Sequence, residues 1–167
     1  PKLLVTLGNV PHLADVDTLS LLLGYLGVEV KRQRDNRLHL ATVAPQRVFA
    51  DFELVQQMRA SFCVLGPLLA RRGRAVVPLP GGCRIGERPI DLHLHGLSAL
   101  GAELRIQQGH VVGSARQLRG TRIHLAGPCG PTVTGTANVL CAAALAHGRT
   151  IITGAATEPE VVDLGNY

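Results

Sequence analysis

The chain repeats part of its own sequence, and this repeat limits the folds that it can adopt. One pair of similar segments shares a Leu-Gly step that recurs after 74 positions, and a second pair shares a Leu-Ala step that recurs after 76. Two interleaved similarities at nearly one period indicate a duplicated unit, and such units usually stack on a shared core. The similar segments are 15–30 with 90–104, and 67–77 with 143–152.

Each unit predicts the same order of elements. An acidic residue precedes leucines at helical spacing, and the helix ends at Gly27 or Gly101, because glycine readily forms a left-handed cap. A hairpin follows, then an apolar helix without a polar face, which indicates burial on nearly all sides. A strand after Gly73 or Gly148 closes the unit. The expected ranges are 28–32 and 102–106 for the first strands, 37–41 and 110–113 for the returning strands, and about 54–71 and about 135–146 for the buried helices.

The two ends of the chain do not coincide with the ends of a unit. Residues 156–163 resemble the start of a third helix of the first type, but the chain stops at Tyr167 before we expect that helix to be built. A length of 167 residues is sufficient for one domain with a substantial core. We therefore expect residues 1–167 to form one domain, truncated at both ends from a longer protein.

The charge of the chain favours small anionic partners. Lys and Arg total 17 against 12 Asp and Glu, which gives a formal net charge of +5. Nucleic acid is disfavoured, because the basic residues are scattered and aromatic residues that stack on bases are nearly absent. A nucleotide-sugar diphosphate or a phosphorylated small acid explains the same charge. The four cysteines lack CxxC pairing, and no leader or membrane-length apolar run is present, so we expect a reduced, cytoplasmic protein that binds no membrane.

Cys83 lies in a glycine-rich segment, PGGCRIGERPIDLH, in which two arginines follow it. The neighbouring glycines allow the backbone to approach a ligand closely and to move. Arg84 and Arg88 can stabilise a thiolate or hold an anionic substrate beside the sulfur atom. A free cysteine is more often a small buried residue, but the glycines and arginines here favour a reactive thiol.

This segment resembles the cysteine loop of the UDP-N-acetylglucosamine 1-carboxyvinyltransferases, a family of enolpyruvyl transferases. The segments NVPHLADVDTLSLLLGYLGVEV, MRASFCVLGPLLARRG and PTVTGTANVLCAAALAHGRTIITGAATEPEVVDL resemble the family in the same order. The resemblance implies an α/β fold of the enolpyruvyl-transferase type, an inside-out α/β barrel domain built from repeated helix-strand units around buried helices. In that family two such domains face each other across the active site. This chain would cover most of the cysteine-loop domain and none of its partner domain.

The resemblance also implies a reaction. It is the transfer of the enolpyruvyl group from phosphoenolpyruvate to the 3-hydroxyl of UDP-N-acetylglucosamine, the first committed step of peptidoglycan synthesis, and we expect this chain alone to be inactive. The methylene carbon of phosphoenolpyruvate must be protonated, so a general acid must lie over it. Cys83 matches the family cysteine implicated as that acid, which is also the target of fosfomycin. No cofactor and no metal are implied, and a zinc site of Cys83, His93 and His95 would fit no common spacing.

The substrate-binding residues are carried over from the same resemblance. Arg88 matches an arginine at the phosphate and carboxylate, where a planar fork binds oxyanions well, although an ion pair with Glu87 is the alternative. Asp91 either contacts the uridine or caps the following helix. Arg59, expected inside an apolar helix, requires a ligand or a buried carboxylate. The full set is Arg59, Arg88, Pro89, Ile90, Asp91, Leu92, Gly130, Pro131, Thr132 and Val133.

Two positions depart from the family pattern. Thr134 stands where the family commonly has glycine, and Gly130 stands where some members have lysine, which leaves the strength of diphosphate binding open. The alternatives are a catalytically silent nucleotide-sugar-binding domain and an enzyme like 3-phosphoshikimate 1-carboxyvinyltransferase, which lacks this cysteine loop. The other cysteines, Cys63, Cys129 and Cys141, are expected to be packing residues.

Overall fold

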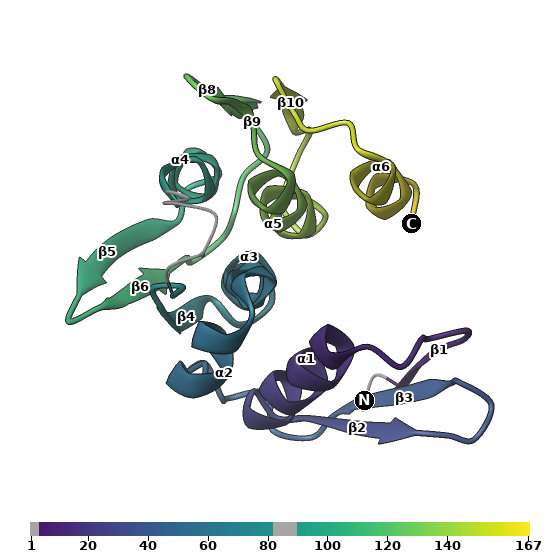
Figure 1. Cartoon of the computed structure of the whole chain (residues 1–167). Helices are drawn as coiled ribbons and strands as arrows, with labels where there is room; N and C mark the ends of the chain where they lie inside the picture. The colour runs from purple at the N-terminus through teal and green to yellow at the C-terminus, as the bar shows by residue number, and fades with distance from the viewer. Residues whose placement is uncertain (1–3, 82–89) are drawn as a thin grey trace.

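The structure is a computed structural model that describes residues 4–81 and 90–167, and its sheets repeat one arrangement (Figure 1). Two antiparallel sheets of three strands have the same strand order. In each sheet a hairpin supplies two neighbouring strands, and the second strand of the hairpin lies in the centre. The third strand, which comes earlier in the chain and is followed by a helix, pairs with the other side of that central strand. The first sheet contains β1 (Leu4–Leu7), β3 (Leu38–Thr42) and β2 (Val28–Arg32), with α1 (Ala14–Tyr25) after β1. The second contains β4 (Arg74–Pro78), β6 (His110–Ser114) and β5 (Glu103–Gln107), with α4 (Asp91–Ala99) before its hairpin.

Parallel pairing confirms the duplication at the spacing of the sequence repeat. Phe49 pairs with Val76 as an isolated parallel bridge, and Ile123 pairs with Ile152 in the parallel sheet of β7 (Arg122–His124) and β10 (Ile151–Thr153). Ile123 follows Phe49 by 74 positions, and Ile152 follows Val76 by 76 positions. These are the same offsets that separate the similar sequence segments. Strand β4 ends the first unit but pairs with the hairpin of the second, so the two units share one sheet.

The apolar helices lie at the centre of the molecule. Figure 1 shows α3 (Leu65–Arg72) and α5 (Val133–Ala143) in the middle, with α1, α4 and α6 (Pro159–Asn166) and the sheets around them. None of the residues of α5 is exposed, and both central helices contribute side chains to the one buried apolar cluster. An added Cβ at Gly66 of α3 would overlap the backbone carbonyl of Asn138 in α5, so the two helix backbones approach closely. Buried apolar helices are therefore present at the centre as expected, although their bounds differ from the predicted ones.

The expected single helix over 54–71 is wrong. This segment forms α2 (Phe52–Gln57), a 3-10 helix η1 (Arg59–Val64) and then α3. The backbone of Met58 is extended, with φ −139° and ψ 118°, and separates α2 from η1. Pro67 has no N–H, and inside one long helix its ring would clash with the carbonyl of Cys63, whereas in the first turn of α3 it is tolerated. Arg59 therefore begins a short helix instead of lying inside a long one.

Glycine residues end two of the helices, and a threonine marks the start of another. Gly27 and Gly101 have φ of 79° and 99° after α1 and α4, which confirms the two predicted glycine caps. Helix α5 begins two residues earlier than expected, because the hydroxyl of Thr132 accepts the N–H of Gly135 at 3.2 Å. Helix α6 is formed, contrary to the expectation that the chain stops before it, and it buries Val161.

Candidate functional site

The predicted substrate-binding residues that the structure describes lie at the starts of three helices. Arg59 is the first residue of η1, while Ile90 precedes α4 and Asp91 and Leu92 begin it. Thr132 caps α5 and Val133 is its first residue. Gly130 and Pro131 form β9, which pairs with β8 (Ala126–Gly127). Cys83, Arg88 and Pro89 lie outside the described residues.

The start of α5 presents backbone N–H groups. The hydroxyl of Thr132 accepts the N–H of Gly135, and the carbonyl of Thr132 accepts the N–H of Thr136 at 2.9 Å. The preceding amides, those of Val133 and Thr134, have no carbonyl partner within an α-helix. Free amides and the positive end of the helix dipole suit a phosphate group.

The hairpin before α5 lies against the start of α4. An added Cβ at Gly127 of β8 would lie 3.5 Å from Cδ1 of Leu92. Gly130, the first residue of β9 after the turn of the same hairpin, has a φ of 90°, which glycine adopts without strain. The structure therefore brings the hairpin that contains Gly130 and Pro131 close to Leu92 at the start of α4.

A buried polar cluster, which we call the His93 cluster, lies behind these helix starts and consists of His93, Thr134 and Asn138. His93 is 3% exposed and Asn138 is fully buried. Asn138 Nδ2 lies 3.0 Å from His93 Nδ1, and His93 Nε2 lies 3.2 Å from Thr134 Oγ1. Sequence analysis did not predict this cluster, although the histidine follows directly after the expected uridine segment.

Asn138 joins the cluster to η1 and α3. Its Oδ1 accepts the N–H of Gly66 at 2.6 Å, and its Nδ2 also donates to the carbonyl of Phe62 at 3.2 Å. The ring of Phe62 meets the ring of His93 edge-on, with centroids 5.2 Å apart. One side-chain amide therefore links α5 to η1, α3 and α4, with all of its hydrogen-bonding groups used.

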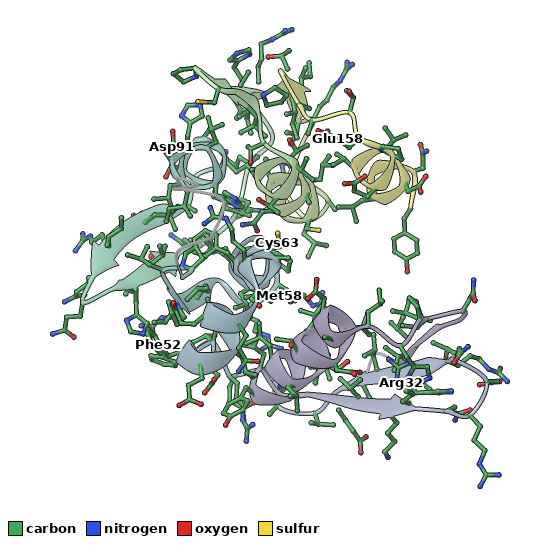
Figure 2. All side chains as sticks on the ribbon, in the orientation of Figure 1. Arg32, Phe52, Met58, Cys63, Asp91 and Glu158 are labelled. Atoms are coloured by element: carbon green, nitrogen blue, oxygen red, sulfur yellow. The ribbon has the colours of Figure 1, made fainter. Side chains whose placement is uncertain are left out.

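The imidazole of His93 is neutral. Burial, and to a smaller extent the positive charge of Arg59, lowers its pKa to about 4, although the carboxylate of Asp91 acts in the opposite direction. Since Nδ1 accepts from Asn138, Nε2 carries the proton and donates to Thr134. The charges of Arg59, the first residue of η1, and of Asp91, the first residue of α4 (labelled in Figure 2), therefore both act on one buried ring.

The described cysteines differ in environment. The thiol of Cys63 donates to the carbonyl of Thr134 at 3.5 Å, and burial, with a contribution from Cys141, raises its pKa to about 11. Burial also raises the pKa of Cys141. Both are half-buried, as expected of packing residues, whereas Cys129 is exposed beside β9, so the expectation that it packs is wrong.

The residues on either side of the cysteine segment are held in place by packing and by a hydrogen bond. Leu79 and Ile90 pack against the apolar core on either side of it. Gln56 of α2 donates from Nε2 to the carbonyl of Leu79 at 2.7 Å, and its Oε1 lies where a Cβ at Gly81 would be. Residues 79–81 are therefore held by α2, and Ile90 is held at the start of α4.

The metal alternative finds no support among the residues that the structure describes. Residues 4–81 and 90–167 contain no group of three His, Cys, Asp or Glu side chains that could hold an ion. Both ring nitrogens of His93 are hydrogen-bonded, and His95 lies on the exposed side of α4. Over the same two ranges, no helix combines the length and apolar character needed to cross a membrane.

The chain matches one protein family over nearly its full length. The family model described as EPSP synthase (3-phosphoshikimate 1-carboxyvinyltransferase) matches residues 2–167. Curated relatives named UDP-N-acetylglucosamine 1-carboxyvinyltransferase are 52% identical in Gloeobacter violaceus, over 96% of this chain, and 56% identical in Anaeromyxobacter sp. (strain K), over 95%. The chain covers 34% and 38% of these two relatives, so it spans little more than a third of their length.

Solved structures share the fold. The enolpyruvyl transferase NikO from Streptomyces tendae superposes with a TM-score of 0.80 at 20% identity, covering 98% of this chain and 38% of that one. An EPSP synthase from Acinetobacter baumannii gives a TM-score of 0.69 at 15% identity, covering 95% of this chain and 37% of that one. At these identities the likeness establishes the fold alone, and it agrees with the fold class that the family resemblance implied.

Proposed function

Because the chain belongs to the EPSP synthase family of enolpyruvyl transferases, we propose that the protein that carries it transfers the enolpyruvyl group of phosphoenolpyruvate to the 3-hydroxyl of UDP-N-acetylglucosamine. The observation that carries the proposal is the identity of 46–56% with relatives named for this acceptor, over 95–98% of the chain. The solved EPSP synthase is only 15% identical, which favours the nucleotide sugar over shikimate 3-phosphate as the acceptor.

In the proposed reaction the 3-hydroxyl gives up its proton to a base and its oxygen bonds to carbon 2 of phosphoenolpyruvate, while the neighbouring methylene accepts a proton from an acid. Loss of phosphate, together with loss of a proton from the new methyl group, restores the carbon-carbon double bond. We assign the first proton to the thiol of Cys83 and the binding of phosphate and carboxylate to Arg88. Both roles rest on the family resemblance, because these residues lie outside the described ranges.

The described helix starts supply the proposed site for the nucleotide. The amides of Val133 and Thr134 can donate to the diphosphate, and the positive end of α5 stabilises its charge. Arg59 adds a positive charge near the start of α4, where Asp91 and the backbone beside it are proposed to contact the uridine. A second domain of the whole protein is proposed to complete the active site from the other side.

The proposal includes a cellular role. The reaction would be the first committed step of peptidoglycan synthesis, carried out in the cytoplasm, so its loss would affect cell shape and division. Fosfomycin is proposed to inactivate the protein by alkylating Cys83. No cofactor, membrane or nucleic acid takes part in the proposed reaction.

The test is phosphate release by the full-length protein with phosphoenolpyruvate and one of two acceptors. We expect release with UDP-N-acetylglucosamine and none with shikimate 3-phosphate. Release with shikimate 3-phosphate alone would support the rival enzyme. Binding of UDP-N-acetylglucosamine without any release would support a catalytically silent binding domain and contradict the proposal.

A further inference from the structure

We propose that His93 is a positioning residue for the nucleotide sugar, which fixes the start of α5 relative to the start of α4 by holding the Thr134 hydroxyl and the Asn138 amide. The inference rests on the proposed function and assigns to the same site a residue that the resemblance left without a role. His93 itself touches no substrate in this proposal. It acts through the backbone amides of α5.

The donors and acceptors in the His93 cluster can be assigned in only one way. Gly66 N–H donates to Asn138 Oδ1, which fixes the orientation of the amide and directs its Nδ2 toward Phe62 and His93. His93 Nδ1 must then be the acceptor and Nε2–H the donor to Thr134 Oγ1. Turning the ring over would put carbon atoms at both hydrogen-bonding positions, and protonating Nδ1 would place two N–H donors face to face. The imidazole is therefore fixed in one orientation and one tautomer.

This orientation connects the two helix starts that are proposed to bind the nucleotide. Thr134 is the second residue of α5, and its amide is one of the two proposed diphosphate donors. His93 is the third residue of α4, directly after Asp91 and Leu92. Loss of the bond to Thr134 would free the first turn of α5 to shift, and small displacements of positioning groups strongly weaken binding and rate.

The Thr134 contact is a property of this chain rather than of the family pattern. The family commonly has glycine at this position, and glycine has no side chain for an imidazole to hold. The Thr134 carbonyl also accepts the thiol of Cys63, so both the side chain and the backbone of this residue are held. Thr134 is thus fixed from α4 and from η1 at the point where the diphosphate is proposed to bind.

The test uses steady-state kinetics of the full-length protein. We expect Thr134→Val, which removes only the hydroxyl, and His93→Phe, which removes both hydrogen bonds, each to raise KM for UDP-N-acetylglucosamine about tenfold, the size expected for one or two buried hydrogen bonds. KM for phosphoenolpyruvate should change by less than about twofold in both variants. His93→Gln, whose amide reaches the position of Nε2, should recover most of the loss. His95→Phe, the same substitution on the exposed side of α4, should have no effect.

The two proposals fail in distinguishable ways. Wild-type turnover combined with unchanged KM in Thr134→Val and His93→Phe would overturn only the positioning role. Equal losses for both substrates would do the same, because they would indicate a smaller folded fraction. A wild-type protein that binds UDP-N-acetylglucosamine without turnover would contradict the proposed function. The positioning role of His93 would then be tested by calorimetry, as a rise in the dissociation constant for this sugar in Thr134→Val and His93→Phe. A wild-type protein that neither binds nor turns over this sugar would overturn both.

Discussion

Substituting Gly66 by alanine should test the close crossing of the two central helices. Gly66 lies in the first turn of α3, and an added Cβ would overlap the carbonyl and the side-chain oxygen of Asn138 in α5. Both atoms belong to a buried residue, so neither can move into solvent. We therefore expect Gly66→Ala to destabilise the protein, although alanine is the better helix former.

The size of the effect follows from two contributions. Overpacking a buried contact costs roughly 1–3 kcal/mol. Separating α3 from α5 also lengthens the 2.6 Å hydrogen bond from Gly66 N–H to Asn138 Oδ1, and a weakened buried hydrogen bond costs roughly 1–3 kcal/mol. Against this, alanine gains about 1 kcal/mol in helix propensity. The expected net loss is about 1–5 kcal/mol.

Gly24 supplies the matched control, because it lies inside α1 with no atom within 4 Å of an added Cβ. Gly24→Ala should leave stability unchanged or raise it by about 1 kcal/mol. The assay is urea unfolding of the full-length protein, followed by circular dichroism. The midpoint should fall for Gly66→Ala and hold or rise for Gly24→Ala. Equal midpoints for Gly66→Ala and wild type would refute the close crossing.

Four further predictions concern the site. Cys83→Ser in the full-length protein should lose most activity while Cys83→Asp restores an acid and retains more, and equal activities would exclude proton donation by residue 83. Arg88→Lys should cost roughly 1.5–3 kcal/mol, about ten- to a hundredfold in kcat/KM, and near-wild-type kinetics would remove Arg88 from the site. At pH 8 a thiol reagent should label Cys129 well before Cys63, whose pKa is raised to about 11, and mass mapping that finds equal rates would contradict its burial. Because folding lowers the pKa of His93 from 6.5 to about 4, the unfolded state binds its proton first. The free energy of unfolding should therefore fall by up to about 3 kcal/mol as pH drops from 6.5 toward 4, measured as a falling urea midpoint, and His93→Gln should remove most of this pH dependence.

The repeat made the duplicated unit and the order of its elements predictable from sequence, and the family resemblance supplied the fold class. Gly27 and Gly101 terminate equivalent helices, and the offsets of 74 and 76 recur as parallel pairs of strand residues in space. Periodicity failed over 54–71, because an apolar run does not reveal where the backbone leaves the helix. The relevant signals were Pro67, which is tolerated only near a helix start, and Asp51, whose carboxylate accepts the N–H of Leu54 at 3.0 Å.

The candidate site was predictable only where residues lie at helix starts. Thr132 and Asp91 precede or begin helices, and the resemblance assigned them to the substrate before any geometry was known. The His93 cluster was not predictable, because its three members come from two helices and a buried histidine with an asparagine looks like ordinary core packing. Thr134 was noted only as a departure from glycine, yet its hydroxyl and carbonyl both hold hydrogen bonds from other elements.

The most direct measurement is the identity of the reaction product. The full-length protein, incubated with phosphoenolpyruvate and UDP-N-acetylglucosamine, should yield a nucleotide sugar heavier by one enolpyruvyl group, together with an equal amount of phosphate. Nuclear magnetic resonance should place the new ether at the 3-oxygen of the sugar. Unchanged UDP-N-acetylglucosamine after prolonged incubation with folded protein, or an enolpyruvyl group attached to a different acceptor, would contradict the proposed function.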